Sequence, residues 1–167
     1  MNRLRSFFAD RKGTAAVEFA FVSLFFFATL MVALDFGFYT QQKLKLGASV
    51  EQAAILAYNK QIGTAATPTT TTVRDYVQNY SGLQTAPTAT VTCNGGGTAV
   101  CGDGKCSCIT STGTFTYPVA CNAACPTGGV AGNYLKIDAQ ATYHAVIVPN
   151  QYLNNSTIKQ TAVVRLQ

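Results

Sequence analysis

The feature that most constrains this chain is a long apolar run near its start. From Thr14 to Leu34 the sequence TAAVEFAFVSLFFFATLMVAL extends for 21 residues, with Glu18 as its only charged residue. As a helix this run spans about 31 Å at about 1.5 Å per residue, which matches a bilayer hydrocarbon core of about 30 Å. The run therefore predicts a helix that crosses a membrane.

A buried core helix and a secretory signal peptide both fit this run less well. A core helix of a globular domain seldom carries bulky aromatic residues on all sides. This run does so with Phe21, Phe25, Phe26 and Phe27. A secretory signal peptide has a shorter apolar core followed by a small-residue cleavage site, whereas DFGFYTQQK follows here. We therefore expect the apolar helix to stay attached to the mature protein.

The charge distribution predicts the orientation of this helix. The formal net charge is +5, and residues 1–13 contribute a net +3 from Arg3, Arg5, Arg11 and Lys12 against Asp10. The positive-inside tendency places this segment in the cytoplasm and the remainder of the chain outside. Only a net +2 is spread over the remainder. No basic face remains there to hold a phosphate backbone, so we expect no nucleic-acid partner.

All cysteines lie in one Gly- and Thr-rich loop, residues 93–125. They are Cys93, Cys101, Cys106, Cys108, Cys121 and Cys125. An even number of cysteines on the exported side favours disulfides, because that compartment is oxidising. A zinc site is the alternative, with Cys121-x3-Cys125 as one half and the other half drawn from Cys101, Cys106 and Cys108. Spacing does not choose among the disulfide pairings.

Catalytic patterns are missing from the sequence. His144 is the only histidine, and the exported acids Asp103 and Asp138 stand apart from each other in the sequence. There is no Ser/His/Asp grouping, no phosphate-binding loop and no metal cluster with catalytic spacing. We therefore expect a protein that is not an enzyme and that uses no cofactor and no metal.

Helical periodicity continues beyond the membrane segment. We assign residues 14–36 to the transmembrane helix and residues 37–62 to its continuation. An apolar seam at helical spacing marks the continuation: Tyr39, Leu46, Val50, Ala53 and Ala57. Such a seam packs either on a sheet of the same chain or on another subunit, and the pattern leaves both open.

The rest of the chain predicts a small exported domain. Residues 63–72 are expected to form a linker, and residues 73–167 an α+β domain that begins with a short helix over residues 73–81. Alternating apolar residues predict four strands, over residues 88–92, 115–117, 134–148 and 158–166. The expected fold class is α+β, a long N-terminal helix followed by a small antiparallel sheet with a Cys-rich loop.

The start of the apolar helix resembles a known family. The string Arg11-Lys12-Gly13-Thr14-Ala15-Ala16-Val17-Glu18-Phe19 resembles the processing site of type IV pilins, a basic leader and a Gly before an apolar helix with Glu at its fifth position. The run from Gly13 to Ala20 is similar to the start of TadE-like proteins of tight-adherence (Flp) pilus systems. The resemblance covers about residues 11–60 and, weakly, the last strand.

This resemblance implies a pilin-like fold and the roles of four residues. Prepilin peptidase would remove residues 1–13 by cutting between Gly13 and Thr14. Glu18, with Phe19 beside it, would act in assembly by pairing with the N-terminal amine of a neighbouring subunit. The expected partners are this peptidase, other pilins or pseudopilins through the N-terminal helix, and the lipid bilayer.

The resemblance also implies a location and a function. The chain would lie in the bacterial inner membrane with its N-terminus cytoplasmic and its C-terminal domain periplasmic, or be incorporated into an extracellular pilus. It would be a minor pilin or pseudopilin-like component in adhesion or pilus biogenesis, since major Flp pilins are little more than the helix. The alternatives are an unprocessed adhesin-like surface-binding module and a type II secretion pseudopilin.

Overall fold

The fold is known from a computed structural model of the chain. The parts that it describes are residues 11–63, 70–96, 101, 104–145, 147–149, 151–152 and 157–166.

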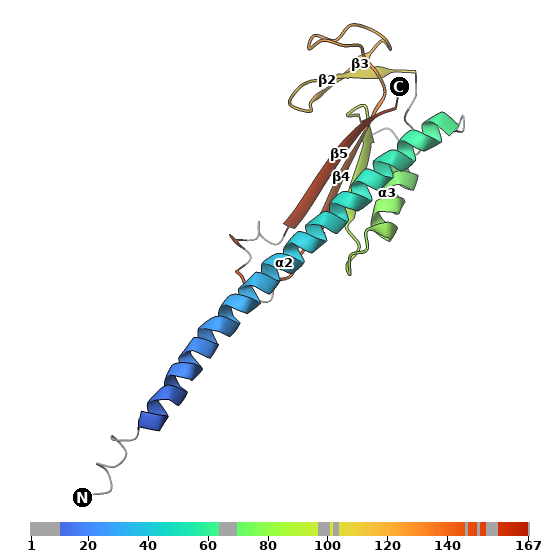
Figure 1. Cartoon of the computed structure of the whole chain (residues 1–167). Coiled ribbons are helices and arrows are strands. Elements are labelled where there is room, and N and C mark those ends of the chain that lie inside the picture. Colours follow the sequence, from blue (N-terminus) through green and yellow to red (C-terminus); the bar gives the residue numbers. More distant parts are fainter. Residues whose placement is uncertain are drawn as a thin grey trace, which may run out of the picture.

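One unbroken helix organises the molecule. Helix α2 runs from Arg11 to Gly63 and holds 53 residues. Its first half stands clear of the rest of the protein and its second half lies along a sheet (Figure 1). Side chains of the first half are exposed, for example Phe19 at 74% and Phe25 at 70%. The predicted transmembrane segment and its continuation thus form a single rod.

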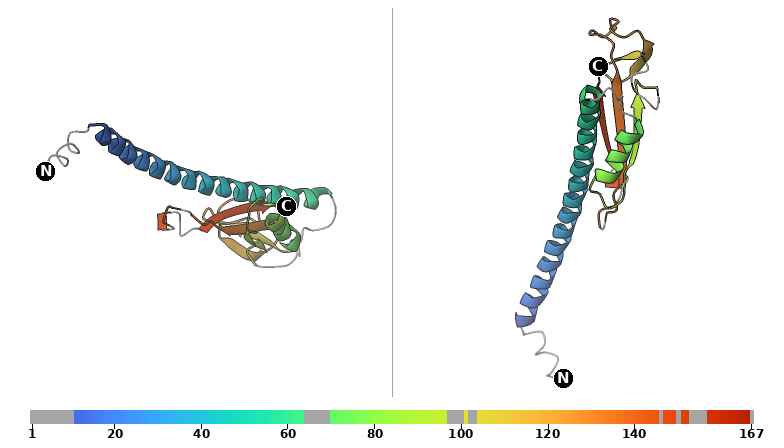
Figure 2. Two further views of the ribbon diagram at one scale, coloured as in Figure 1. Left: turned by 90° about the horizontal axis from the view of Figure 1, so that it is seen from below. Right: turned by 90° about the vertical axis from the view of Figure 1, so that its right-hand side faces the viewer.

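A three-stranded antiparallel sheet faces the second half of α2. Its strand order is β1-β4-β5, with β4 in the centre. The strands are β1 (Thr88–Cys93), β4 (Tyr134–Thr142) and β5 (Thr157–Arg165). A short helix, α3 (Thr70–Tyr80), packs against both α2 and β1. Figure 2 shows α2 along one face of this sheet.

The core forms where the predicted helical seam meets the alternating strand residues. Leu46 and Ala53 of α2 are fully buried, as are Leu135 and Ile137 of β4. Val50 and Ala57 are buried with them, and Tyr39 packs at the edge of the same cluster. Burying such side chains is the main favourable term in folding. The seam therefore packs on the chain's own sheet.

A second, smaller unit lies at the end of the molecule farthest from the start of α2 (Figure 1). This Cys-rich unit, residues 104–132, contains the antiparallel pair β2 (Cys106–Ile109) and β3 (Phe115–Val119). Its small core consists of Cys106, Cys108 and Ala131 with partly buried neighbours. So small a core needs covalent support, which disulfides supply.

A buried polar junction joins the Cys-rich unit to the sheet. The Asn94 side chain donates to the Asn133 side chain at 3.1 Å and accepts from the Ser107 hydroxyl at 3.2 Å. Gly95 follows with a φ of +75°, and a Cβ atom there would meet the Phe115 side chain at 2.7 Å. Only glycine fits this combination of backbone angle and close contact.

The predicted fold class is confirmed: the chain is α+β, with a long apolar helix, a small antiparallel sheet and disulfides in the loop region. The main differences from expectation are two boundaries and one additional strand. Helix α3 begins at Thr70, within the expected linker, of which residues 64–69 lie outside the described parts. Strand β4 ends at Thr142 rather than residue 148, and β2 is a strand that the sequence does not predict. Strand β2 is short, and Ser107 between its two buried cysteines is buried as well, so it shows no alternation.

Truncation of the seam should destabilise the exported domain. We expect Leu46→Ala to lower the free energy of unfolding by about 2–5 kcal/mol, because it leaves a cavity beneath the sheet. Urea unfolding of the full chain in detergent micelles, followed by tyrosine circular dichroism, measures this. Leu44→Ala is the matched control, since Leu44 is 68% exposed on the same helix. Equal effects of the two variants would contradict the packing described.

Candidate assembly and membrane site

The residues predicted to act in processing and assembly lie together on the part of α2 before Asp35, which stands clear of the sheet domain and which we call the free half of α2. Gly13, Thr14 and Glu18 are all exposed, and Phe19 is 74% exposed. Glu18 follows Thr14 by four residues, so the two lie one turn apart on the same side of the helix. The start of α2 stands clear of the described part of the sheet domain (Figure 1). The structure thus leaves this helical surface open to other molecules.

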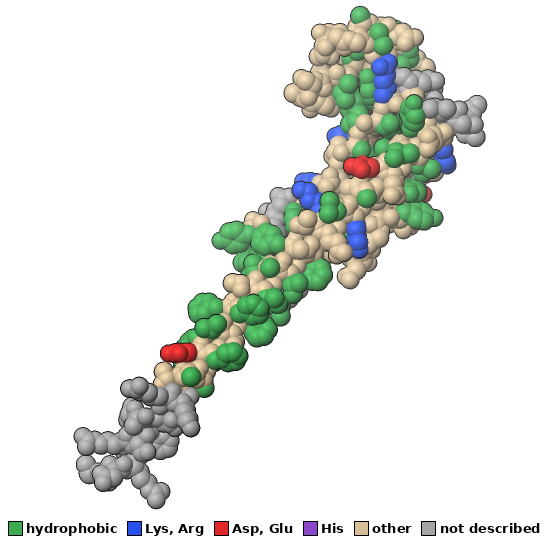
Figure 3. Space-filling model, viewed as in Figure 1, with side chains coloured by type: hydrophobic (Ala, Val, Ile, Leu, Met, Phe, Trp, Pro, Cys, Tyr) green, Lys and Arg blue, Asp and Glu red, His purple; other side chains and the backbone are tan. Residues whose placement is uncertain are grey.

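The same half of α2 has the properties of a membrane anchor. It is long and apolar enough to cross a membrane, and none of its most apolar stretch is buried within the protein. Hydrophobic side chains cover it on the visible face (Figure 3). Among the described residues only this helix qualifies. An exposed apolar surface of this size marks a contact with a membrane or another protein.

A buried carboxylate lies where the free half of α2 ends. Asp35 is 2% exposed although it is the first charged residue after the apolar run. Its Oδ2 atom accepts hydrogen bonds from the backbone N–H groups of Ile147 at 2.7 Å and Val148 at 2.9 Å. A charged acceptor with several donors strengthens each bond. Asp35 therefore fastens the segment that follows β4 to the helix.

Tyr143 completes this contact. Its hydroxyl lies 3.0 Å from Oδ1 of Asp35 and 3.0 Å from the Asp35 carbonyl oxygen. Its ring packs edge-on against Tyr39 of α2, with 5.6 Å between the ring centroids. The pKa of the Tyr143 phenol is raised, first because burial disfavours the phenolate and then because of the hydrogen bond to Asp35 and its negative charge.

Sequence reasoning misses the Asp35 contact, because in the sequence Asp35 is only the first charge after the apolar run. The contact also explains why β4 is shorter than expected. The alternation continues to Tyr143, but the N–H groups of Ile147 and Val148 are used by Asp35 instead of a neighbouring strand. The sequence signal that could have indicated this contact is Asp35 itself, an acid with apolar residues of the helix on both sides.

The six cysteines form three disulfides and none is free. The pairs are Cys93–Cys101, Cys106–Cys121 and Cys108–Cys125. The first fastens the end of β1 to the loop that follows it, and the other two join β2 to the segment after β3. Within the described residues there is no group of three or more His, Cys, Asp or Glu side chains that could hold a metal.

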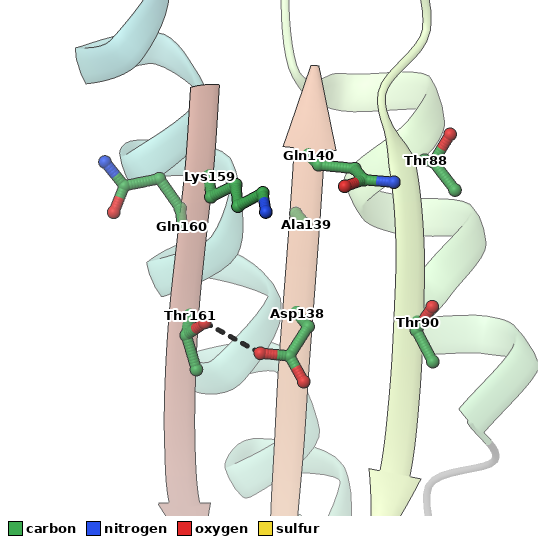
Figure 4. A pocket seen from close by; sticks show the side chains of 8 residues that line it. All are labelled: Thr88, Thr90, Asp138, Ala139, Gln140, Lys159, Gln160 and Thr161. Carbon is green, nitrogen blue, oxygen red and sulfur yellow. Dashed lines mark hydrogen bonds between the residues drawn. The ribbon is translucent and has the colours of Figure 1, made fainter. Parts of the chain in front are cut away.

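The outer face of the sheet, opposite α2, is polar. A depression of about 270 Å³ lies over the middle of this face, lined by Thr88, Thr90, Asp138, Ala139, Gln140, Lys159, Gln160 and Thr161. Asp138 accepts a hydrogen bond from Thr161 at 2.7 Å (Figure 4) and forms an ion pair with Lys136 at 2.9 Å. His144 is exposed and lies elsewhere, among the residues of another shallow pocket. Hydrogen bonding to a polar ligand is the chemistry that this face offers.

The fold is α+β, with an apolar helix that continues into the core of a small disulfide-bonded sheet domain. The family model described as TadE-like protein matches residues 13–54, which confirms the resemblance over that part of the chain. The matched residues all lie in α2, so the similarity covers the helix and not the sheet domain. No curated protein and no solved structure matches the chain significantly.

Loss of the Asp35 carboxylate should weaken the exported domain. We expect Asp35→Ala to lower the free energy of unfolding by about 1.5–3 kcal/mol or more, since buried N–H donors lose a charged acceptor. Asp138→Ala is the control, because that carboxylate is 42% exposed in its ion pair and should change stability by about 0–1 kcal/mol. Denaturant titration of the full chain in micelles compares them, and a larger loss for Asp138→Ala would refute the role of Asp35.

The contribution of Tyr143 to the stability of the fold should decrease at alkaline pH. Since its pKa is raised on folding, the unfolded chain releases this proton first as the pH rises above about 10. The stabilisation from Tyr143 is therefore fully present below that pH and is lost as the pH rises through the folded-state pKa. The difference in unfolding free energy between wild type and Tyr143→Phe should shrink over this range. A difference that stays constant up to strongly alkaline pH would contradict the shift.

Proposed function

We propose that this chain is a minor pilin or pseudopilin-like component of a Flp type IV pilus or of its assembly machinery, without enzymatic activity. The observation that carries the proposal is the family match over residues 13–54, which falls on a helix whose first half is exposed and bears Gly13, Thr14 and Glu18. A surface of this kind suits insertion first into a bilayer and then among the helices of other subunits.

The proposed location follows from charge and from the disulfides. The basic segment before the apolar run favours a cytoplasmic N-terminus by the positive-inside tendency. Three disulfides on the other side of the anchor suit the oxidising periplasm. Together they support an inner-membrane protein whose sheet domain is periplasmic until any incorporation into a pilus.

Processing gives Glu18 its proposed role. A carboxylate in a membrane helix costs roughly 2.5–3.5 kcal/mol at the helix centre on insertion scales and less near an interface, and intramembrane carboxylates usually have a function. Glu18 is the fifth residue of the apolar run and therefore lies near one end of it. Cleavage after Gly13 by prepilin peptidase creates a free amine on Thr14. In the proposed assembly Glu18 of one subunit pairs with this amine of a neighbour, and Phe19 packs beside the pair between the helices.

The length of the chain supports a minor rather than a major subunit. By the family resemblance, a major Flp pilin is little more than the helix. Here α2 is followed by a sheet, a second helix and the Cys-rich unit.

The experiment that tests the proposal is N-terminal sequencing and intact-mass measurement of the protein from membranes with and without prepilin peptidase. We expect the mature chain to begin at Thr14 only when the peptidase is present. Gly13→Val should block cleavage, because a side chain there obstructs close approach of the protease to the backbone.

Gly37→Val is the matched control for this experiment. Both glycines lie in α2, and a Cβ atom at either position meets nothing within 4 Å, so neither substitution disturbs the fold directly. Cleavage should therefore continue in Gly37→Val. A chain that begins at Met1 with and without the peptidase would refute the proposed cleavage and favour an unprocessed anchored protein.

One observation favours a second candidate, an adhesin-like surface-binding module. The polar depression on the outer face of the sheet presents the side chains of Gln140, Lys159 and Thr90 to solvent (Figure 4). Such groups can bind a polar surface by hydrogen bonding. Adhesion of cells that display the uncleavable Gly13→Val chain, lost on Lys159→Ala and Gln140→Ala substitution, would support this candidate.

A further inference from the structure

The segment that follows β4 lies beside the base of the exported domain. We call residues 147–149 and 151–152 the post-β4 segment. It is held there by the Asp35 carboxylate, which accepts from the N–H groups of Ile147 and Val148. Figure 1 shows this part of the chain beside α2, where the helix leaves the domain.

These hydrogen bonds determine the position of the segment along the axis of α2, and so its distance from the apolar run. Asp35 comes directly after the apolar run that ends at Leu34. The Ile147 nitrogen is 2.7 Å from the Asp35 carboxylate, and side chains of a helix lean towards its N-terminus. Ile147 therefore lies no farther from the apolar run than the turn of α2 that contains Asp35. If α2 spans a bilayer, this level is the membrane surface.

The post-β4 segment exposes large apolar side chains at this level. Ile147 is 48% exposed and Tyr152 is 69% exposed, whereas Val148 between them is buried against the domain. A turn closed by the Tyr152 N–H and the Pro149 carbonyl at 3.0 Å holds the segment in a bend. On α2 itself Phe36 and Phe38 are also about half exposed. Hydrophobic side chains extend from the bare length of α2 to the lower end of the domain (Figure 3).

The charge pattern fits a lipid surface. No Asp, Glu, Lys or Arg occurs between His144 and Lys159, although charged residues lie on both flanking strands. Insertion of a charged group below the headgroups is costly, whereas tyrosine is enriched at membrane interfaces because its ring is apolar and its hydroxyl is polar. A stretch without charges that exposes an isoleucine and a tyrosine is therefore suited to the boundary between headgroups and acyl chains.

We propose that the post-β4 segment is a second membrane contact, in which Ile147 and Tyr152 enter the headgroup region of the bilayer that α2 spans. This inference rests on the proposed membrane insertion of α2. The contact is separate from the anchor, because it belongs to a segment more than 100 residues later in the chain, joined to the helix through Asp35. Two contacts fix the tilt and rotation of the exported domain on the membrane, which one helix alone does not.

Single-tryptophan variants of the full chain test this proposal, since the sequence contains no tryptophan. Tyr152→Trp reports on the proposed contact. Tyr80→Trp on α3 is the matched control, because Tyr80 is also 69% exposed and lies away from the anchor. Phe25→Trp reports on the anchor itself. Each variant is reconstituted into phosphatidylcholine vesicles, with lipids that carry a nitroxide quencher near the headgroup or deep in the acyl chain.

For Tyr152→Trp we expect a blue-shifted emission, quenching by the headgroup nitroxide and protection from aqueous iodide. Tyr80→Trp should emit at longer wavelength and be quenched by iodide, and Phe25→Trp should be quenched by the deep nitroxide. Adding Asp35→Ala to Tyr152→Trp should restore quenching by iodide, because the segment loses its fastening.

The outcomes separate the two proposals. If Phe25→Trp is quenched by the deep nitroxide while Tyr152→Trp behaves like Tyr80→Trp, the anchor is inserted and the second contact is refuted. If Phe25→Trp is itself quenched by iodide, the membrane insertion of α2 fails, and the second contact fails with it.

Discussion

The structure depends on the continuity of α2 through two environments. Its first half exposes an apolar surface, and its second half buries Leu46, Ala53 and Ala57 under the sheet without a break in the helix. A helix this long bends only gently unless a proline or a bulge interrupts it. The direction of the anchor therefore determines the direction of the whole domain. In the proposed membrane topology, the Cys-rich unit becomes the part farthest from the bilayer (Figure 1).

Asp35 lies at the change from one environment to the other. Within the apolar run a carboxylate would be costly, and on the outer side of the domain it would be solvated and of little consequence. At its actual position the bonds to Tyr143, Ile147 and Val148 compensate for its burial. One side chain thus connects the end of the anchor, the end of β4 and the segment proposed to touch the membrane.

The sequence predicts those features that depend on periodicity or composition. The apolar helix, the seam from Leu46 to Ala57 and the inward residues of β4 each follow a regular spacing, and the structure has all of them. The Asp35 contact joins residues 108 or more positions apart, so no local pattern encodes it. The disulfide pairing likewise depends on how β2 and β3 fold back. The roles of Gly13, Thr14, Glu18 and Phe19 come from the family resemblance and stay predictions.

The placement of the disulfides has a mechanical consequence. All three close loops between Cys93 and Cys125, and none links α2 to the sheet. When tension is applied between the anchor and the Cys-rich unit, α2 is held to the sheet only by packing and hydrogen bonds, including those of Asp35. Because the seam lies parallel to the helix axis, a pull along that axis loads many contacts in shear at once. The Cys-rich unit can stay folded under a force that slides the helix along its sheet.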